Sequence, residues 1–143
     1  MKSKKITGGS IKKRLLKKDN KDLPLISIIT VVLNNKKFLQ QSINSISNQT
    51  YKNYELIIID GKSTDGTVDI LKKNNSKIDF WISEKDKGIY DAMNKGMKLS
   101  RGSIISILNS DDIFYKHTLK IATNYFNRYQ NIDFLFGSVI KYK

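Results

Sequence analysis

The sequence predicts an α/β domain built on a mainly parallel sheet with helices on both faces. Four runs of aliphatic residues, at positions 25–32, 54–59, 78–82 and 104–108, are typical of strands that are buried on both sides. Segments whose apolar residues have helical spacing separate these runs, and they are long enough for βαβ crossovers. This alternation is typical of Rossmann-like folds.

The helices and turns follow from local signals between the strands. Four segments carry an apolar stripe at helical spacing, formed by Phe38, Leu39, Ile43 and Ile46, by Val68, Ile70 and Leu71, by Ile89, Ala92, Met93 and Met97, and by Leu119, Ala122, Tyr125 and Phe126. Ser63, Thr64 and Asp65 can cap the second of these helices. Gly102 suits a left-handed stop after the third, and residues 133–140 predict a final strand.

The composition restricts the chemistry that the chain can carry. Its 143 residues include no cysteine and a single histidine, which excludes disulfides and thiolate metal sites and argues against a zinc cluster. A metal would be held mainly by carboxylates and ligand oxygens, which indicates Mg²⁺ or Mn²⁺. No apolar run approaches the roughly 18 residues that span a bilayer, and no signal peptide is visible. A cytoplasmic location is therefore expected.

The net charge of +13 is concentrated near the N-terminus. Residues 1–23 hold nine Lys or Arg and two Asp, a net charge of +7, and Pro24 separates them from the regular pattern. We expect a basic, flexible tail over residues 1–23 and a folded domain over residues 24–143. A short amphipathic helix over residues 11–18 would be attracted to an anionic membrane surface or a polyanion. A plain solvated tail is the alternative.

Carboxylates follow the ends of three of the four predicted strands. Asp60 ends the second strand, Glu84 and Asp86 follow the third, and Asp111 and Asp112 follow the fourth. Ligands of open parallel sheets bind outside the carboxyl ends of the strands. Two adjacent carboxylates in a confined site raise one pKa or recruit a cation, so the Asp pair predicts a divalent cation that bridges a diphosphate. For each carboxylate, a turn or helix-capping role is the alternative.

Two common nucleotide-binding motifs are absent from the sequence. No G-x-G-x-x-G follows the first strand, and no G-x-x-x-x-G-K-[ST] occurs anywhere. A dinucleotide-dependent dehydrogenase and a P-loop ATPase are therefore disfavoured, although the sheet would suit either. Asp60 instead fits a residue that accepts hydrogen bonds from a nucleobase or ribose.

The ordered motifs over residues 24–143 resemble those of the family 2 glycosyltransferases, which are inverting enzymes with a GT-A fold. The resemblance rests on PLISIIT at residues 24–30, SISNQTY at 45–51, YELIIIDGKSTDGT at 54–67, SEKDKGIYDAMNKG at 83–96 and LNSDD at 108–112. Each stretch alone is a moderate signal. All five in this order are a strong one.

The resemblance implies a site for a nucleoside diphosphate sugar, with uracil as the common base. Residues 30–34 should wall the nucleotide, largely through backbone atoms, Asp60 should read the base, and residues 86–94 should lie beside the ribose and pyrophosphate. Asp111 and Asp112 should hold Mn²⁺ or Mg²⁺ on the diphosphate. The nucleotide-sugar-binding residues that it implies are Thr30, Val31, Leu33, Asn34, Asp60, Ser63, Asp86, Lys87, Asn94 and Asp111.

The chain also departs from the family pattern. Asn109 stands where many members have the first Asp of the Asp-x-Asp motif, and Gly61 replaces a frequent second Asp after Asp60. The carboxylate that deprotonates the acceptor hydroxyl is expected beyond Lys143, in an acceptor half that a second chain would supply. No catalytic residue is therefore expected within this chain, whose fold is expected to stop before the acceptor half.

The expected function is transfer of a sugar from a UDP-sugar to a glycan or a lipid-linked acceptor, as in polysaccharide biosynthesis. It would take place in the cytoplasm, at the inner face of a membrane if residues 1–23 bind there. One alternative is a non-catalytic nucleotide-binding or interaction module. The other is a basic nucleic-acid-binding protein, which no base-reading motif supports, so nucleic acid is not an expected partner.

Overall fold

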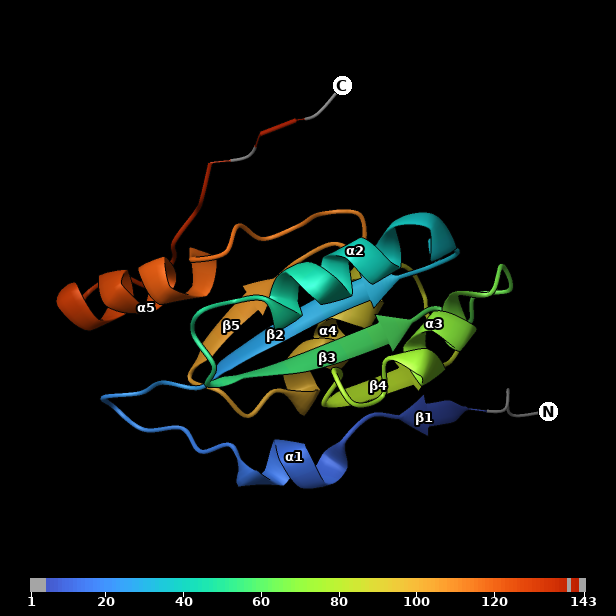
Figure 1. The fold of residues 1–143 in the computed structure, drawn as a ribbon, viewed down its shortest axis with the longest axis horizontal. Helices are drawn as coiled ribbons and strands as arrows, with labels where there is room; N and C mark the ends of the chain where they lie inside the picture. Colours follow the sequence, from blue (N-terminus) through green and yellow to red (C-terminus); the bar gives the residue numbers. More distant parts are fainter. Residues whose placement is uncertain (1–4, 139, 142–143) are drawn as a thin grey trace.

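The computed structural model of the protein describes residues 5–138, 140 and 141. The strands of these residues form one sheet in the order β1-β4-β3-β2-β5 (Figure 1), and they are β1 (Ile6–Gly8), β2 (Ile26–Val32), β3 (Tyr54–Asp60), β4 (Phe80–Ser83) and β5 (Ile104–Ile107). β2 to β5 pair in parallel, whereas β1 pairs antiparallel with β4. The predicted α/β class and mainly parallel sheet are confirmed.

Helices cover both faces of the sheet (Figure 1), and they are α1 (Ile11–Leu16), α2 (Lys36–Ser47), α3 (Thr67–Lys73), α4 (Ile89–Leu99) and α5 (Thr118–Arg128). Successive strand residues point to opposite faces. The even-numbered apolar residues of β2 and β3 join one core cluster with apolar residues of α2, α3 and α5. The odd-numbered apolar residues join a second cluster with α4. Four of these helices match the apolar stripes of the sequence.

The two central strands carry the site to one edge of the sheet. Every residue of β2 and β3 is buried, as expected for parallel strands that are covered on both faces. Their register pairs Val32 with Asp60. The loops that follow these two residues therefore start side by side at the carboxyl edge.

Residues 6–17, which the sequence assigns to a tail, contact the sheet in this structure. β1 adds an antiparallel edge to β4 and pairs Ile6 with Ser83 and Gly8 with Trp81. α1 then lies near the amino ends of the strands, where Arg14 Nε is 2.7 Å from Glu55 Oε2 and Lys17 Nζ is 2.6 Å from Asp79 Oδ1. These two cations thereby neutralise two buried carboxylates, Glu55 on β3 and Asp79 just before β4.

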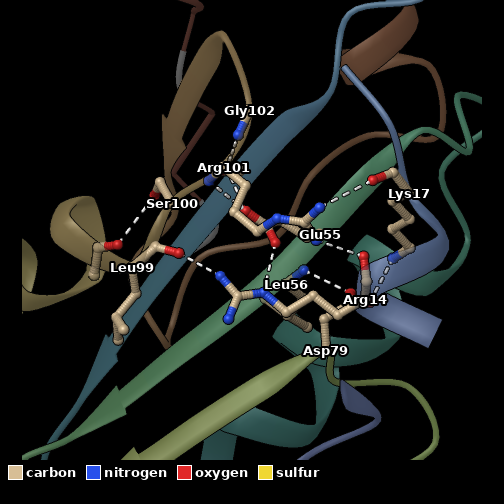
Figure 2. A network of polar contacts seen from close by, with 11 residues as sticks. Arg14, Lys17, Glu55, Leu56, Asp79, Leu99, Ser100, Arg101 and Gly102 are labelled. Atoms are coloured by element: carbon tan, nitrogen blue, oxygen red, sulfur yellow. Dashed lines mark hydrogen bonds and ion pairs between the residues drawn. The ribbon is translucent and has the colours of Figure 1, made fainter. Parts of the chain in front are cut away.

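These two ion pairs belong to a wider polar network (Figure 2). Glu55 Oε1 also accepts hydrogen bonds from the Ser27 hydroxyl at 2.7 Å and from the Arg101 amide at 2.8 Å. Asp79 Oδ2 accepts one from the Leu56 amide at 2.8 Å. Burial lowers the pKa of Lys17, while its hydrogen bond to Asp79 acts in the opposite direction. The network ties the N-terminal segment to β2, β3 and the chain after α4.

Two local expectations are wrong. Residues 133–138 and 140 form no strand, and Val139 of the predicted strand 133–140 lies outside the described residues. An extended segment gains no ladder hydrogen bonds without a neighbour, and this one leads away from the sheet after α5 (Figure 1). Gly102 is not a left-handed stop either. A Cβ there would lie 2.2 Å from the carbonyl oxygen of Leu25, so glycine is needed for close backbone approach.

Within the described part of the chain, the helices are too short or too polar to cross a membrane.

Candidate functional site

A series of hydrogen bonds joins the loops that follow β2, β3 and β5. The Asn34 amide donates to the Ser63 hydroxyl at 2.7 Å, and the Thr64 amide donates to Asn34 Oδ1 at 2.8 Å. Asn35 Nδ2 donates to the Ser110 hydroxyl at 2.9 Å. Asn34 thus connects the first loop to the second, and Asn35 connects it to the third. The structure therefore brings the predicted residues Asn34, Asp60, Ser63 and Asp111 to one edge of the sheet.

Asp60 organises the loop after β3 from inside the protein. Its side chain is completely buried. Oδ1 accepts a hydrogen bond from the Ser63 hydroxyl at 2.5 Å, and Oδ2 accepts from the Ser63 amide at 3.0 Å and from the Ser83 hydroxyl at 2.5 Å. The carboxylate therefore holds the turn 61–63 and ties it to β4. The geometry gives Asp60 the turn role that the sequence left open beside base reading.

Two residues of these loops have left-handed backbone conformations without being glycine. Asn34 has a φ of 50° and Lys62 a φ of 70°. Asparagine tolerates this region, whereas the Cβ of a lysine raises the cost to roughly 1–2 kcal/mol. Such strain persists only where the surroundings over-determine the conformation, and it is concentrated at functional sites. Both residues lie next to the Asn34–Ser63 hydrogen bond.

Gly61 leaves space for the carboxylate of Asp86. A Cβ at Gly61 would lie 2.7 Å from Asp86 Oδ2 and 3.3 Å from Leu33 Cδ1. Oδ1 of Asp86 accepts a hydrogen bond from the Gly88 amide at 2.9 Å, which holds it in place. The glycine that departs from the family pattern is therefore matched to the position of Asp86. Leu33, also predicted at the site, is exposed beside it.

Asp65 connects the loop after β3 to the start of α2. Its Oδ1 accepts from the Thr67 hydroxyl at 2.6 Å and from the Thr67 amide at 2.9 Å, while Oδ2 accepts from the Lys36 amide at 2.9 Å. The Thr67 hydroxyl and the Lys36 amide lower the pKa of this carboxyl. Asp65 was expected as a helix cap only. Its hydrogen bond to the Lys36 amide, 29 residues away, could not be predicted from the sequence.

Asp111 and Asp112 follow β5 on the exposed surface. Asp111 makes no hydrogen bond or ion pair with another described residue. Asp112 Oδ2 accepts from Asn109 Nδ2 at 3.2 Å, and the Asp112 amide donates to the Asn109 carbonyl at 3.1 Å. The pair is thus a turn in which Asn109 orients Asp112 and leaves Asp111 open.

The fit of this turn to a divalent cation depends on these two carboxylates. The described residues contain no group of three or more His, Cys, Asp or Glu side chains that could hold a metal. Mg²⁺ commonly uses one or two protein carboxylates and completes its shell with phosphates and water. Two exposed, adjacent carboxylates fit that requirement, whereas they would not form an all-protein cage.

The remaining predicted residues lie on β2, on α4 or in the loop before α4, and not all of their side chains reach the carboxyl edge of the sheet. Thr30 is in the interior of β2, and its buried Oγ1 has no hydrogen-bond partner among the described residues. Val31 is buried against the α4 cluster. Lys87 is exposed, and its amide donates to Asp91 Oδ2 at 3.0 Å. Asn94 is exposed on α4. The structure does not bring the side chains of Thr30 and Val31 to the open edge.

Sequence reasoning assigned no role to two residues that assemble this edge. Ser83 reaches Asp60 from β4, and the amide side chain of Asn35 reaches Ser110. The available signal for both was their position, because Ser83 ends β4 and Asn35 follows β2. Two hollows of about 300 and 480 Å³ share Lys21, Phe126 and Asn127 as lining residues. They lie near the amino end of β5 and do not coincide with this edge.

An open, mainly parallel sheet with polar loops joined at its carboxyl edge is the arrangement in which α/β domains bind their ligands. Residues 27–142 match the profile of the family described as Glycosyl transferase family 2, and the chain belongs to this family. It is 35% identical over 121 residues to a PGL/p-HBAD biosynthesis glycosyltransferase of Mycobacterium bovis. That match covers 82% of this chain and 47% of the relative, so the chain spans about half of the relative's length.

Solved structures of glycosyltransferases share the fold. S. aureus TarS 1–349 in complex with UDP-GlcNAc aligns with a TM-score of 0.67 and 25% identity, over 73% of this chain and 32% of that one. A mannosyltransferase from Pyrobaculum calidifontis, in complex with GDP-Man and Mn²⁺, aligns with a TM-score of 0.67 and 22% identity, over 80% and 37%. The fold is therefore that of the GT-A glycosyltransferases.

Proposed function

We propose that the chain is the nucleotide-sugar-binding part of a glycosyltransferase that takes its sugar from a UDP-sugar. The observation that supports this most is a set of hydrogen bonds at one edge of the sheet. Asn34 is bonded to Ser63, and Asn35 is bonded to Ser110. Membership of the family and the UDP-GlcNAc complex of TarS agree with it. The acceptor would be a glycan or a lipid-linked sugar, and the reaction would take place on the cytoplasmic side of a membrane.

The exposed residues of the edge have chemistry suited to a diphosphate. Asp111, with Asp112 beside it, would hold Mn²⁺ or Mg²⁺. When such a cation is bound, it supplies a Lewis acid that offsets charge on the departing nucleoside diphosphate. Lys36 at the start of α2 and Lys62 and Lys87 in the adjoining loops are exposed and add a positive field for the same anion. Asp60 would act by holding the turn that presents Ser63, in addition to any contact with the base.

Transfer also needs a carboxylate that deprotonates the acceptor hydroxyl. We propose that it belongs to an acceptor half, carried by a longer form of this protein or by a second chain. The isolated chain should then bind the donor without transferring the sugar.

Calorimetry with UDP tests the donor site directly. We expect binding that strengthens when Mn²⁺ is added, and a loss of this metal effect in Asp111→Asn. Lys120→Gln on α5 is a matched control for a change of one exposed charge. The proposal is wrong if UDP does not bind with or without the metal. Binding to RNA or DNA that weakens steeply with salt, in the absence of UDP binding, would favour the nucleic-acid alternative instead.

A further inference from the structure

α1 is docked through Arg14, whose side chain points toward the protein, and through Lys17, which follows the helix. The Arg14 guanidinium contacts Glu55 and the carbonyl oxygen of Leu99, and Lys17 contacts Asp79 (Figure 2). The Arg14 and Lys17 side chains are only 13% and 12% exposed. Both also lie over aromatic rings, Arg14 over Phe80 at 5.6 Å and Lys17 over Tyr54 at 5.1 Å. The orientation of the helix is therefore set by buried ion pairs.

The apolar residues of α1 consequently face outward. Ile11, Leu15 and Leu16 are 55%, 64% and 80% exposed. At about 100° per residue, they are separated from Arg14 by about 60°, 100° and 160° around the helix, so exposure rises with distance from the anchored side. An ordinary surface helix has the opposite arrangement, with its apolar stripe toward the core. Figure 1 shows α1 on the outside of the molecule, with no other element beyond it.

Lysines surround this apolar surface. Residues 5–18 contain no Asp or Glu, and Lys5, Lys12, Lys13 and Lys18 are all exposed. We define the α1 patch as Ile11, Lys12, Lys13, Leu15, Leu16 and Lys18. Apolar side chains flanked by lysines on a helix are the composition that partitions into an anionic lipid interface.

We propose that the α1 patch binds the surface of a membrane that contains anionic phospholipids. A second copy is a poorer occupant, because two identical patches would bring their lysines together. The ion pairs to Glu55 and Asp79 hold the helix ready, so binding does not have to order it first. This inference rests on the docking of α1 and not on the proposed sugar transfer.

The position of the patch leaves the candidate donor site free. Arg14 contacts Glu55 near the start of β3, whereas Asp60 ends that strand, five residues or roughly 17 Å further along. Membrane binding through α1 therefore should not compete with UDP. If the donor site proves wrong, lipid binding is still expected, and the two proposals fail separately.

Vesicle flotation tests the patch with the full chain. We expect binding to vesicles with about 30 mol% phosphatidylglycerol in phosphatidylcholine, weak binding to phosphatidylcholine alone, and a decrease as salt rises. Leu15→Ser/Leu16→Ser should reduce the partition coefficient at least about tenfold. Lys12→Ala/Lys13→Ala should reduce it roughly 25-fold. UDP should change neither value.

Matched controls lie on other helices. Ile121 on α5 is 53% exposed, and Lys72 and Lys73 on α3 are exposed. Ile121→Ser and Lys72→Ala/Lys73→Ala should leave flotation unchanged. The proposal is overturned if wild type does not float with anionic vesicles, if neutral vesicles bind equally well, or if Leu15→Ser/Leu16→Ser binds like wild type. It is also overturned if sedimentation without lipid shows a dimer that this double variant abolishes, because a second copy would then cover the patch.

Discussion

The hydroxyl of Ser83, on β4, donates a hydrogen bond of 2.5 Å to Oδ2 of Asp60, at the end of β3. Together with Ser63, it satisfies a carboxylate that has no exposed surface. Asp60→Asn would place an NH₂ group against these donors. We therefore expect a loss of about 2 kcal/mol in the free energy of unfolding, measured in urea without nucleotide.

Asp111→Asn is the matched comparison for Asp60→Asn. Asp111 is exposed and has no partner among the described residues, so its variant should stay within about 0.5 kcal/mol of wild type. If Asp60→Asn were equally neutral, the buried hydrogen bonds would not hold the turn. The role of Asp60 would then be ligand binding and not support of the turn.

Gly61→Ala should disturb the donor site more than it disturbs the fold. The new Cβ would lie 2.7 Å from Asp86 Oδ2, and the flexible Asp86 side chain can rotate away if it gives up its bond to the Gly88 amide. We expect a stability loss of about 1 kcal/mol. UDP affinity should fall roughly tenfold, equivalent to about 1.4 kcal/mol, as measured by calorimetry.

Gly137→Ala is the control for Gly61→Ala, since nothing lies within 4 Å of a Cβ at Gly137. The double variant Gly61→Ala/Asp86→Ala should regain the stability that the steric conflict removes. If Gly61→Ala binds UDP as wild type does, the position of Asp86 does not matter for the donor.

The central strands could be predicted closely because their surroundings are uniform. β2 and β3 are buried along their full length, and a predominantly aliphatic run is the pattern that suits that environment. Polar residues that follow such runs must lie at the carboxyl edge, so Asp60 and Asp111 were found by position. The sequence does not show burial of the Asp60 carboxylate, because its partner Ser83 is 23 residues away.

The docking of residues 5–23 could not be predicted from local pattern. Arg14 and Lys17 meet partners that are 41 and 62 residues away. One signal was available: Glu55 is a charged residue inside a buried run, and such a charge requires a partner. The missing strand over residues 133–138 has the opposite cause. Its sequence pattern is compatible with a strand, but a strand forms only where a neighbouring strand provides backbone hydrogen-bond partners.

Asp65 should titrate below its ordinary pKa of 3.8, because the Thr67 hydroxyl and the Lys36 amide stabilise its charged form. A lowered folded pKa contributes stability that is present above the ordinary value. That contribution is lost as the pH falls through the lowered one. NMR titration of the Asp65 carboxyl carbon measures this directly.

Thr67→Val removes the hydroxyl and should move the Asp65 pKa upward, toward 3.8. Thr64→Val is the control, because the Thr64 amide donates to Asn34 Oδ1 while the Thr64 side chain makes no hydrogen bond to Asp65. An unchanged Asp65 pKa in Thr67→Val would mean that the backbone amides of Lys36 and Thr67 stabilise the charge without the hydroxyl.

Arg14→Ala should be among the most destabilising changes in the chain. Arg14 Nε lies 2.7 Å from Glu55 Oε2, and the Glu55 side chain is completely buried. Removing the cation leaves a buried charge with only neutral hydrogen-bond donors, so we expect a loss of about 3 kcal/mol in urea unfolding. Lys12→Ala, two residues away on α1 and exposed, should change the free energy by less than about 0.5 kcal/mol. Arg14→Met/Glu55→Gln removes both charges and should recover most of the loss, because no buried charge then lacks a partner. If Arg14→Ala is as stable as Lys12→Ala, water reaches Glu55 and the ion pair does not hold α1 against the sheet.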